Sequence, residues 1–429
     1  MLIAMPNPAA SAATAASAAR LRVLVVDEAP PYPPDSGKRL RTWHLLFRLA
    51  ARHQITLLCY ADPDAARQRA AESALHQAGI ACQAVEALPE LSGMRLYTRL
   101  LGNLGSAWPY SVAKHHTGRF QAAVEALWAS GRYDLVQVEW TPFASHLAAE
   151  VPHVIASHNI EAQIWQRRAA ISGRWVARPY FLLQAARMRR FERLAFAQAR
   201  AVTTVSAEDR ATALGWGARR STIVANGVDV EYFQPRPDIP VEADTLLFVG
   251  ALDWFPNQDG ILYFTEAILP LIRTQRPACR LRVVGRRPSA ALVQRLSGVA
   301  GVEMIGEVAD VRPYMAAASQ VVVPLRVGGG SRIKIIESLA MDKAVVATAV
   351  GAEGLQAVSG THLLLADTPE SFARAAVQLL QAPAQAQRLG RAGGRWAREH
   401  YNWDDCARAL EAAWRGSLDP LRFPVGGTR

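Results

Sequence analysis

The sequence predicts an α/β protein of two domains, each built on a doubly wound parallel β-sheet. First, the length of 429 residues exceeds what one hydrophobic core usually organises. Second, short and continuously apolar strands alternate with amphipathic helical segments, a pattern typical of parallel sheets with right-handed crossovers. Third, the alternation restarts after a Pro-rich polar stretch at 234–244, whose composition is that of an interdomain linker.

The first half of the chain opens with a βαβ unit. The apolar run LRVLVVD at 21–27 is typical of a strand buried on both faces. Apolar residues at helical spacing over 38–52 and the strand ITLLCY at 55–60 follow it. We expect a further helix at 65–78, a segment of mixed pattern to 132, and strands at 135–138, 153–157, 201–206 and 221–225.

The second half repeats this design. We expect strands at 246–249, 280–284, 302–305, 321–324 and 344–347, with helices at 260–273 and 333–341. The expected domains are 20–236 and 237–401, after a disordered tail at 1–19, with a last helix at 402–416 that can pack back on the first domain. Ligands of such sheets bind beyond the carboxyl ends of the strands, which points to a central cleft between the domains.

Charge and composition restrict the partners. The formal net charge of +11 indicates an anionic partner, and the absence of a recognition motif argues against nucleic acid. The cysteines are too widely spaced for a zinc site or a disulfide framework, which favours a reducing cytoplasm; they are Cys59, Cys82, Cys279 and Cys406. Residues 1–19 do not resemble a secretory signal, and no stretch is apolar enough to cross a bilayer. We expect a cytoplasmic protein whose membrane contact is peripheral.

The most informative segment is VGGGSRIKIIESLA at 327–340, where glycines and a serine lead directly into an amphipathic helix. Glycines allow close backbone approach, and the free amides and dipole of a helix N-terminus attract phosphate. Cations in the first turn are unfavourable beside the positive end of the dipole unless an anion binds there. We therefore expect a diphosphate site made by Gly329, Gly330, Ser331, Arg332 and Lys334.

Glu337 follows on the same helix, and its carboxylate can accept hydrogen bonds from both hydroxyls of a ribose. Together these residues predict a site for a nucleoside diphosphate. The alternative is structural: a glycine-rich turn starts a helix whose Arg, Lys and Glu side chains are solvated.

Longer stretches around this segment resemble a known family. GGGSRIKIIESLAMDKAVVATAVGAEGL at 328–355, NGVDVEYF at 226–233 and FVGALDWFPN at 248–257 are similar to the retaining glycosyltransferases of family 4. The likeness extends from 21 to about 415. It implies the GT-B fold, two Rossmann-like domains facing a central cleft, with the acceptor on the N-terminal and the nucleotide sugar on the C-terminal domain. PYPPDSGKRLRTWHLL at 31–46 and SHNIEA at 157–162 resemble the bacterial branch associated with exopolysaccharide and exosortase gene clusters.

The resemblance implies roles on the donor side. Glu337 would be the second glutamate of the family's paired motif and hold the donor ribose. Arg332 and Lys334 would stabilise charge on the diphosphate leaving group and so count as catalytic. Gly250, within FVGALDWFPN, belongs to the donor-binding set.

Two departures from the family pattern leave donor selection open. Gly329 stands where the first motif glutamate is expected. Asp253 and Trp254 stand where many relatives carry the Arg and Lys that grip the diphosphate. Arg332 and Lys334 can supply those cations from the opposite loop.

On the acceptor side, Gly37 resembles the glycine of a loop that faces donor and acceptor, and Lys38 and Arg39 can add charge; an ordinary turn is the alternative. His158 follows a strand at its carboxyl end, where a histidine of the family lies under the reacting sugar. With its neighbours Asn159 and Glu161 it could orient the acceptor hydroxyl or take its proton. The alternative is a polar helix cap at Asn159.

Two further patterns in the sequence can each be interpreted in two ways. Asp62 and Asp64 form an Asp-x-Asp pair, but we interpret them as helix-capping residues rather than metal ligands, so no metal or other cofactor is expected. The segment 165–200 contains nine arginines and one acidic residue, Glu192, among aromatic side chains. It suits an anionic membrane surface, or equally a core-facing helix with a solvated Arg face.

The sequence thus predicts transfer of a sugar from a nucleoside-diphosphate sugar to an acceptor hydroxyl, on a glycan that can be lipid-linked. One alternative is a sugar-nucleotide isomerase or epimerase of the same architecture. The other is a non-catalytic GT-B subunit, suggested by Gly329.

Overall fold

The computed structural model describes residues 19–88, 93–171, 175–328 and 333–418. Within them the chain forms two compact units, an N-terminal unit of residues 19–225 with 404–418 and a C-terminal unit of residues 226–403. The chain therefore changes units at 225, upstream of the Pro-rich stretch. The expected tail lies almost entirely outside the described residues.

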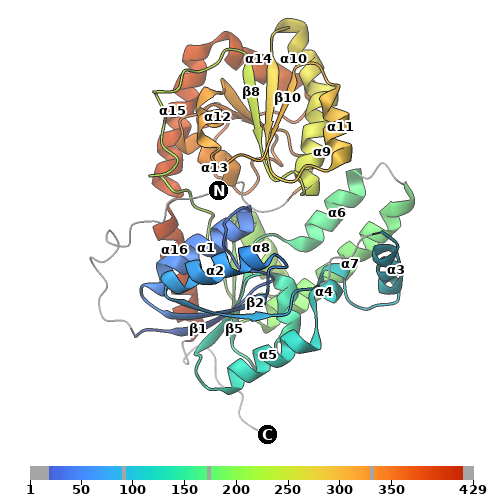
Figure 1. The fold of residues 1–429 in the computed structure, drawn as a ribbon, viewed down its shortest axis with the longest axis vertical. Helices are drawn as coiled ribbons and strands as arrows, with labels where there is room; N and C mark the ends of the chain where they lie inside the picture. The colour runs from blue at the N-terminus through green and yellow to red at the C-terminus, as the bar shows by residue number, and fades with distance from the viewer. Residues whose placement is uncertain (1–18, 89–92, 172–174, 329–332, 419–429) are drawn as a thin grey trace. The chain divides into compact units, whose positions relative to one another are not determined.

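The N-terminal unit contains one parallel sheet in the order β3-β2-β1-β4-β5-β6-β7. Its register places Val25 of the central strand beside Leu57 on one side and Gln137 on the other. Helices cover both faces (Figure 1), which is why the inner strands are continuously apolar. The strands are β1 (Arg22–Val26), β2 (Gln54–Tyr60), β3 (Ile80–Val85), β4 (Leu135–Val138), β5 (His153–Ser157), β6 (Ala201–Thr204) and β7 (Ser221–Ile223).

The helices of this unit begin at polar capping residues or at proline. Ser36 caps α1, Asp64 caps α2 and Thr117 caps α5 by accepting hydrogen bonds from first-turn amides. They are α1 (Gly37–Ala50), α2 (Ala65–Gln77), α3 (Gly93–Leu104), α4 (Tyr110–His115), α5 (Gly118–Ala129), η2 (Thr141–His146), α6 (Glu161–Ile171), η3 (Trp175–Ala177), α7 (Arg178–Gln198) and α8 (Ala207–Gly215).

The last helix, α16 (Trp403–Ser417), packs on the N-terminal unit. Asp404 accepts from Arg48 of α1 at 2.7 Å, and Glu411 pairs with Arg52 at 3.0 Å. The buried indole of Trp414 donates to Gln137 of β4. These contacts fix both ends of α16 to the first sheet.

The C-terminal unit has its own parallel sheet, in the order β10-β9-β8-β11-β12-β13. Its strands are β8 (Thr245–Val249), β9 (Arg280–Val284), β10 (Val302–Gly306), β11 (Gln320–Val323), β12 (Val345–Ala347) and β13 (Leu364–Leu365). Its helices are α9 (Phe255–Tyr263), η4 (Phe264–Ile268), α10 (Leu269–Gln275), α11 (Ala290–Ser297), α12 (Arg312–Ala317), α13 (Ile333–Ala340), α14 (Pro369–Gln381) and α15 (Pro383–His400). Two doubly wound parallel sheets confirm the predicted fold class.

The helix predicted at 260–273 was wrong at its start and in its regularity. It begins at Phe255, with Pro256 in the first turn, where a missing amide hydrogen is harmless. It then loosens into a π-turn over Phe264–Ile268. Pro270 follows two residues after the end of this turn, and because proline cannot donate the next helical hydrogen bond, a widened turn accommodates it.

Smaller differences occur at the edges of the first sheet. β3 was not predicted, because Ile80 is its only buried residue and its side chains lack an apolar run. The strand expected at 221–225 ends at Ile223, before the chain passes into the C-terminal unit. In the part of the chain that the structure describes, no helix combines the length and apolarity needed to span a bilayer.

Candidate functional site

Each sheet has one position where the chain order reverses direction, and doubly wound sheets bind ligands there. In the N-terminal unit it lies between β1 and β4, and in the C-terminal unit between β8 and β11. We call these the N-terminal and C-terminal switch points. The predicted site residues that the structure describes lie beyond the strand ends around these two positions.

At the C-terminal switch point, Gly250 follows β8 and lies against the side chain of Lys334 from α13. A Cβ atom on Gly250 would stand 2.7 Å from Lys334 Nζ and 2.8 Å from Asn257 Nδ2. Such distances are too short for real Cβ contacts, so a larger residue at 250 would have to displace the end of the Lys334 or Asn257 side chain. The structure thus brings two predicted donor-binding residues together.

Lys334 is held in place from two directions. Its Nζ donates to Asn257 Oδ1 at 2.7 Å and lies 4.9 Å from the centre of the Phe248 ring. Asn257 is itself fixed, because its Nδ2 donates to the Ala251 carbonyl at 2.8 Å. A positioned ammonium group at the end of β8 can bind an anion with little reorganisation.

Glu337 lies one turn along α13 from Lys334 and is partly buried. Burial raises the pKa of its carboxyl group to about 7, against the opposing effect of Lys334. Among the described residues, none donates a hydrogen bond to this carboxylate. An ionised carboxylate can accept hydrogen bonds from a ligand that carries hydroxyl donors.

The remaining residues of the glycine-rich segment, Gly329, Gly330, Ser331 and Arg332, lie outside the described residues. Their predicted roles stay predictions.

Sequence reasoning missed one cation near this edge. Arg286 lies two residues beyond the end of β9 and 3.7 Å from Asp253. The signal was present in the run VVGRRP at 283–288, in which arginine directly follows a strand and a glycine. Trp254 caps α9 through its backbone carbonyl.

At the N-terminal switch point, three titratable residues directly follow three adjacent strands. Asp27 follows β1, Glu139 follows β4 and His158 follows β5. Glu139 was missed, although it occupies the same position after its strand as His158 does. The pattern of a short apolar strand followed directly by a titratable residue could have identified Glu139.

Glu139 and His158 are in contact, with Oε2 and Nε2 3.2 Å apart. Burial alone would raise the pKa of Glu139, but His158 and a hydrogen bond from Gln137 hold that pKa at about 2. Burial lowers the pKa of His158, although Glu139 opposes this. Burial therefore favours the neutral imidazole of His158, the form that can accept a proton, beside the Glu139 carboxylate.

The predicted acceptor-side cations are engaged by acidic neighbours. Lys38 Nζ lies 2.5 Å from Asp27 and 2.9 Å from Glu28. Burial opposes its charge, but the two carboxylates raise the pKa of Lys38. Arg39 is 3.5 Å from Asp35. Both cations therefore organise this edge of the sheet.

Gly37 lies at the first position of α1 rather than in a loop, because Ser36 caps the helix one residue earlier. Its backbone conformation does not require glycine, since Gly37 does not occur among the residues of positive φ.

The first-turn amides of α6 find their acceptor on another helix. The amides of Glu161 and Ala162 donate to the buried carboxylate of Glu192 at 2.8 and 3.1 Å. Burial raises the pKa of Glu192, and the neighbouring Glu161 adds to the effect. Glu161 in turn accepts from the Trp140 indole at 3.0 Å, so its side chain is directed toward the N-terminal switch point.

Asp64 caps α2, and Asp62 accepts from the Asp64 amide at 3.0 Å. Of the Asp-x-Asp pair, Asp64 is thus a helix-capping residue, as the sequence predicts. Across the described ranges, no group of three or more His, Cys, Asp or Glu side chains is placed to hold a metal ion.

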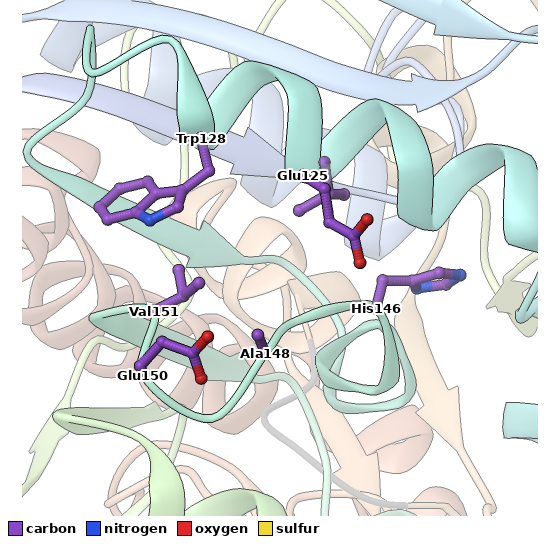
Figure 2. Close-up of a pocket in the computed structure, with 7 residues that line it drawn as sticks. Glu125, Trp128, His146, Ala148, Glu150 and Val151 are labelled. Carbon is purple, nitrogen blue, oxygen red and sulfur yellow. The ribbon is translucent and has the colours of Figure 1, made fainter.

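A shallow pocket occurs elsewhere in the N-terminal unit (Figure 2). It lies between α5, which contributes Glu125 and Trp128, and the loop that leads to β5, with Glu150 and Val151. This is the amino end of β5, opposite to His158. The pocket contains none of the predicted site residues.

Family models match both halves of the chain. The model described as "Glycosyltransferase Family 4" matches residues 37–232, and the model described as "Glycosyl transferases group 1" matches residues 243–382. No curated protein sequence matches the chain.

Solved structures share the fold. Sucrose-phosphate synthase from Thermosynechococcus elongatus is 18% identical with a TM-score of 0.69, over 92% of this chain and 98% of its own. Anabaena Alr3699/HepE in complex with UDP-glucose is 15% identical with a TM-score of 0.64, over 92% and 100%. The trehalose 6-phosphate synthase of Burkholderia multivorans is 14% identical with a TM-score of 0.59, over 94% and 99%. Since the two glycosyltransferase models fall on the two units in turn, we conclude that the chain is a family 4-like glycosyltransferase of the GT-B fold.

Proposed function

We propose that the protein transfers a sugar from a nucleoside-diphosphate sugar to an acceptor hydroxyl, with its donor bound at the C-terminal switch point. The observation that carries this proposal is the packing of Gly250 against Lys334 and Asn257. This packing places a tight backbone turn beside a fixed ammonium group. Both lie at the switch point, the position at which doubly wound sheets bind ligands. The HepE structures, which contain UDP-glucose or UDP, add support by analogy.

In this proposal the cations act on the leaving group. Negative charge develops on the diphosphate as the bond to the sugar breaks, and positioned donors stabilise it in the transition state. Lys334 supplies one such donor, and Arg332 is proposed as a second. Because this stabilisation is electrostatic, the proposed mechanism uses no metal or other cofactor.

Glu337 is proposed to bind the donor ribose. The raised pKa of its carboxyl group means that the empty site holds a partly protonated acid near neutral pH. Two hydroxyl donors from a ribose favour the ionised form. Donor binding should therefore release a proton around pH 7, and donor affinity should increase as the pH rises through this value.

His158 is proposed to contact the acceptor or the reacting sugar. The ionised Glu139 at 3.2 Å from Nε2 favours the tautomer that carries its proton on this nitrogen. Nδ1 then remains able to accept a proton from an acceptor hydroxyl. Gly37, Lys38, Arg39, Asn159 and Glu161 are proposed to shape the same region.

Finer features of the proposal rest on the family 4 match and on sequence resemblance. We propose retention at the anomeric carbon, transfer of a hexosyl group, and a lipid-linked glycan acceptor in exopolysaccharide or cell-surface polysaccharide synthesis. The net charge of +11 supports a peripheral position on an anionic membrane surface, at the inner face of the plasma membrane.

A thermal-shift panel of nucleoside diphosphates and their sugars tests the donor site, because a ligand of the native state raises its stability. We expect one nucleotide class to shift the melting temperature, and Glu337→Ala and Arg332→Ala to abolish the shift without unfolding the protein. An undiminished shift in both variants would remove the proposed site. Donor turnover without any acceptor would favour an isomerase or epimerase, and nucleotide binding without transfer would favour a non-catalytic subunit.

A further inference from the structure

α3 presents its apolar side chains to solvent. Met94, Tyr97, Leu101 and Leu104 are 77, 63, 66 and 45% exposed. Their spacing of three, four and three residues places them on one face of the helix. In a helix that packs on a protein core, such a stripe faces inward. We call these four residues the α3 stripe.

The opposite side of α3, which carries the partly buried Leu96 and Leu100, attaches the helix to its own unit. Asn103 is buried, and its Oδ1 accepts from Gln184 of α7 at 2.9 Å. Arg187 of α7 donates to the carbonyls of Asn103 and Leu104, both at 2.7 Å. Figure 1 shows α3 at the edge of the unit beside α4 and α7. The outward orientation of the stripe is therefore set by specific hydrogen bonds.

The surroundings of the stripe are basic. Residues 93–116 contain Arg95, Arg99 and Lys114 and no acidic side chain. Arg95 is exposed, and Arg99 donates to the carbonyl of Ala113 at 3.2 Å. An exposed apolar stripe beside cations matches a surface that combines hydrocarbon with negative charge.

We propose that α3 docks this protein on an anionic lipid bilayer, with the α3 stripe inserted at the boundary of head groups and acyl chains. A helix of 12 residues is about 18 Å long, too short for a bilayer core of about 30 Å. It must therefore lie in the plane of the interface. Tyr97 suits this depth, since its ring is apolar and its hydroxyl is polar.

This inference assigns the proposed membrane contact to a named element, and in that respect it rests on the proposed function. It adds a named helix to the 165–200 segment, for which the sequence left a membrane surface and a core-facing helix equally open. In that segment Arg187 holds α3, and Arg168 stacks on Trp165 and Phe181.

Vesicle co-sedimentation of the full chain tests the proposal. Vesicles contain phosphatidylcholine alone or with added phosphatidylglycerol. We expect binding to the anionic vesicles that weakens at high salt. Leu101→Ser and Tyr97→Ser should each lower the affinity about tenfold, the factor expected from losing one inserted side chain. Arg95→Gln should lower it less. The matched control is Val241→Ser, at a residue that is 59% exposed in the other unit and should bind like the unchanged protein.

Several results would overturn the proposal. The first is that the unchanged protein does not bind anionic vesicles. The second is that both stripe variants bind as tightly as the unchanged protein. The third is that the unchanged protein binds neutral and anionic vesicles equally. A lipid-free dimer that dissociates in Leu101→Ser, measured by light scattering, would assign the stripe to a second copy of the chain. Nucleotide thermal shifts on the same samples report separately on the donor site, so a failure of either idea is recognised on its own.

Discussion

The two switch points share a topology but have opposite chemistry. In the N-terminal unit, the strands around the switch point end in titratable side chains, namely Asp27, Glu139 and His158. In the C-terminal unit, β8 and β9 are followed by Gly250 and Gly285, and the charge comes from Lys334 on the helix that follows β11. In the proposed function the residues after the strands set the chemistry, with a proton acceptor assigned to one sheet and an anion site to the other.

The glycines of the C-terminal switch point differ in how strictly packing requires them. A Cβ on Gly285 would collide with the backbone carbonyl of Gly250, whereas one on Gly250 would displace the side-chain ends of Lys334 and Asn257. In the N-terminal unit, side chains fill the corresponding space and neutralise one another, as in the contacts of Lys38 with Asp27 and Glu28. We therefore expect substitutions at the two switch points to have different effects on transfer rate and on nucleotide affinity.

The largest effect is expected at the N-terminal switch point. His158→Ala should lower the rate of sugar transfer about 100- to 10,000-fold, the usual range for a lost general base, while leaving nucleotide affinity unchanged. Initial-rate kinetics together with calorimetry measure the two quantities. His76→Ala is the matched control, since His76 is exposed on α2. A loss of nucleotide affinity in His158→Ala would contradict the assignment of donor binding to the C-terminal switch point alone.

Gly250→Ala should produce the reverse pattern. The new methyl group must displace Lys334 or Asn257, so we expect nucleotide affinity to fall about 10- to 100-fold, as for the loss of a hydrogen bond to a charged group. Calorimetry measures this change. Gly298→Ala is the control, because a Cβ there meets nothing within 4 Å. Equal affinities in both variants would show that the close packing at Gly250 is structural.

Glu337→Gln should affect stability in a pH-dependent way. The folded-state pKa of about 7 is above the ordinary value of 4.5, so the ionised carboxyl group makes the empty protein less stable as the pH rises between these values. The variant should therefore be more stable than the parent by about 1 to 3 kcal/mol at pH 8 and equal to it at pH 4.

Denaturant unfolding at both pH values tests the Glu337 prediction, with the exposed Glu399 changed to Gln as the control. The same variant should bind nucleotide more weakly and lose the increase of affinity through pH 7. If the difference in unfolding free energy between the parent and Glu337→Gln is constant from pH 5 to pH 8, the pKa of the Glu337 carboxyl group is not raised.

Much of this architecture could be predicted from the sequence, because continuously apolar strands such as β1, β2 and β5 are buried on both faces. The elements that were missed lack this signal. β3 is an edge strand with Ile80 as its only buried residue. α3 is apolar, but its stripe faces solvent, so its pattern could not be interpreted as packing on a core.

The donor residues could be predicted as a group because they are adjacent in sequence and open a helix. Contacts between distant segments could not. Glu192 caps α6 from α7, and Lys334 reaches Asn257 across the sheet edge. Such partners depend on how the strands are ordered, which one sequence does not specify. Glu139 is different, since its position after a strand was visible and was overlooked.

The central claim is that the C-terminal switch point holds a diphosphate, and titration calorimetry of the full chain with a panel of nucleoside diphosphates tests it most directly. The account predicts that one of them binds, that the affinity falls with salt, and that Lys334→Met weakens binding about 100-fold, as expected for a lost ion pair with phosphate. The control Arg388→Met, at an exposed cation of α15, should bind like the parent. Unchanged affinity in Lys334→Met would contradict the account.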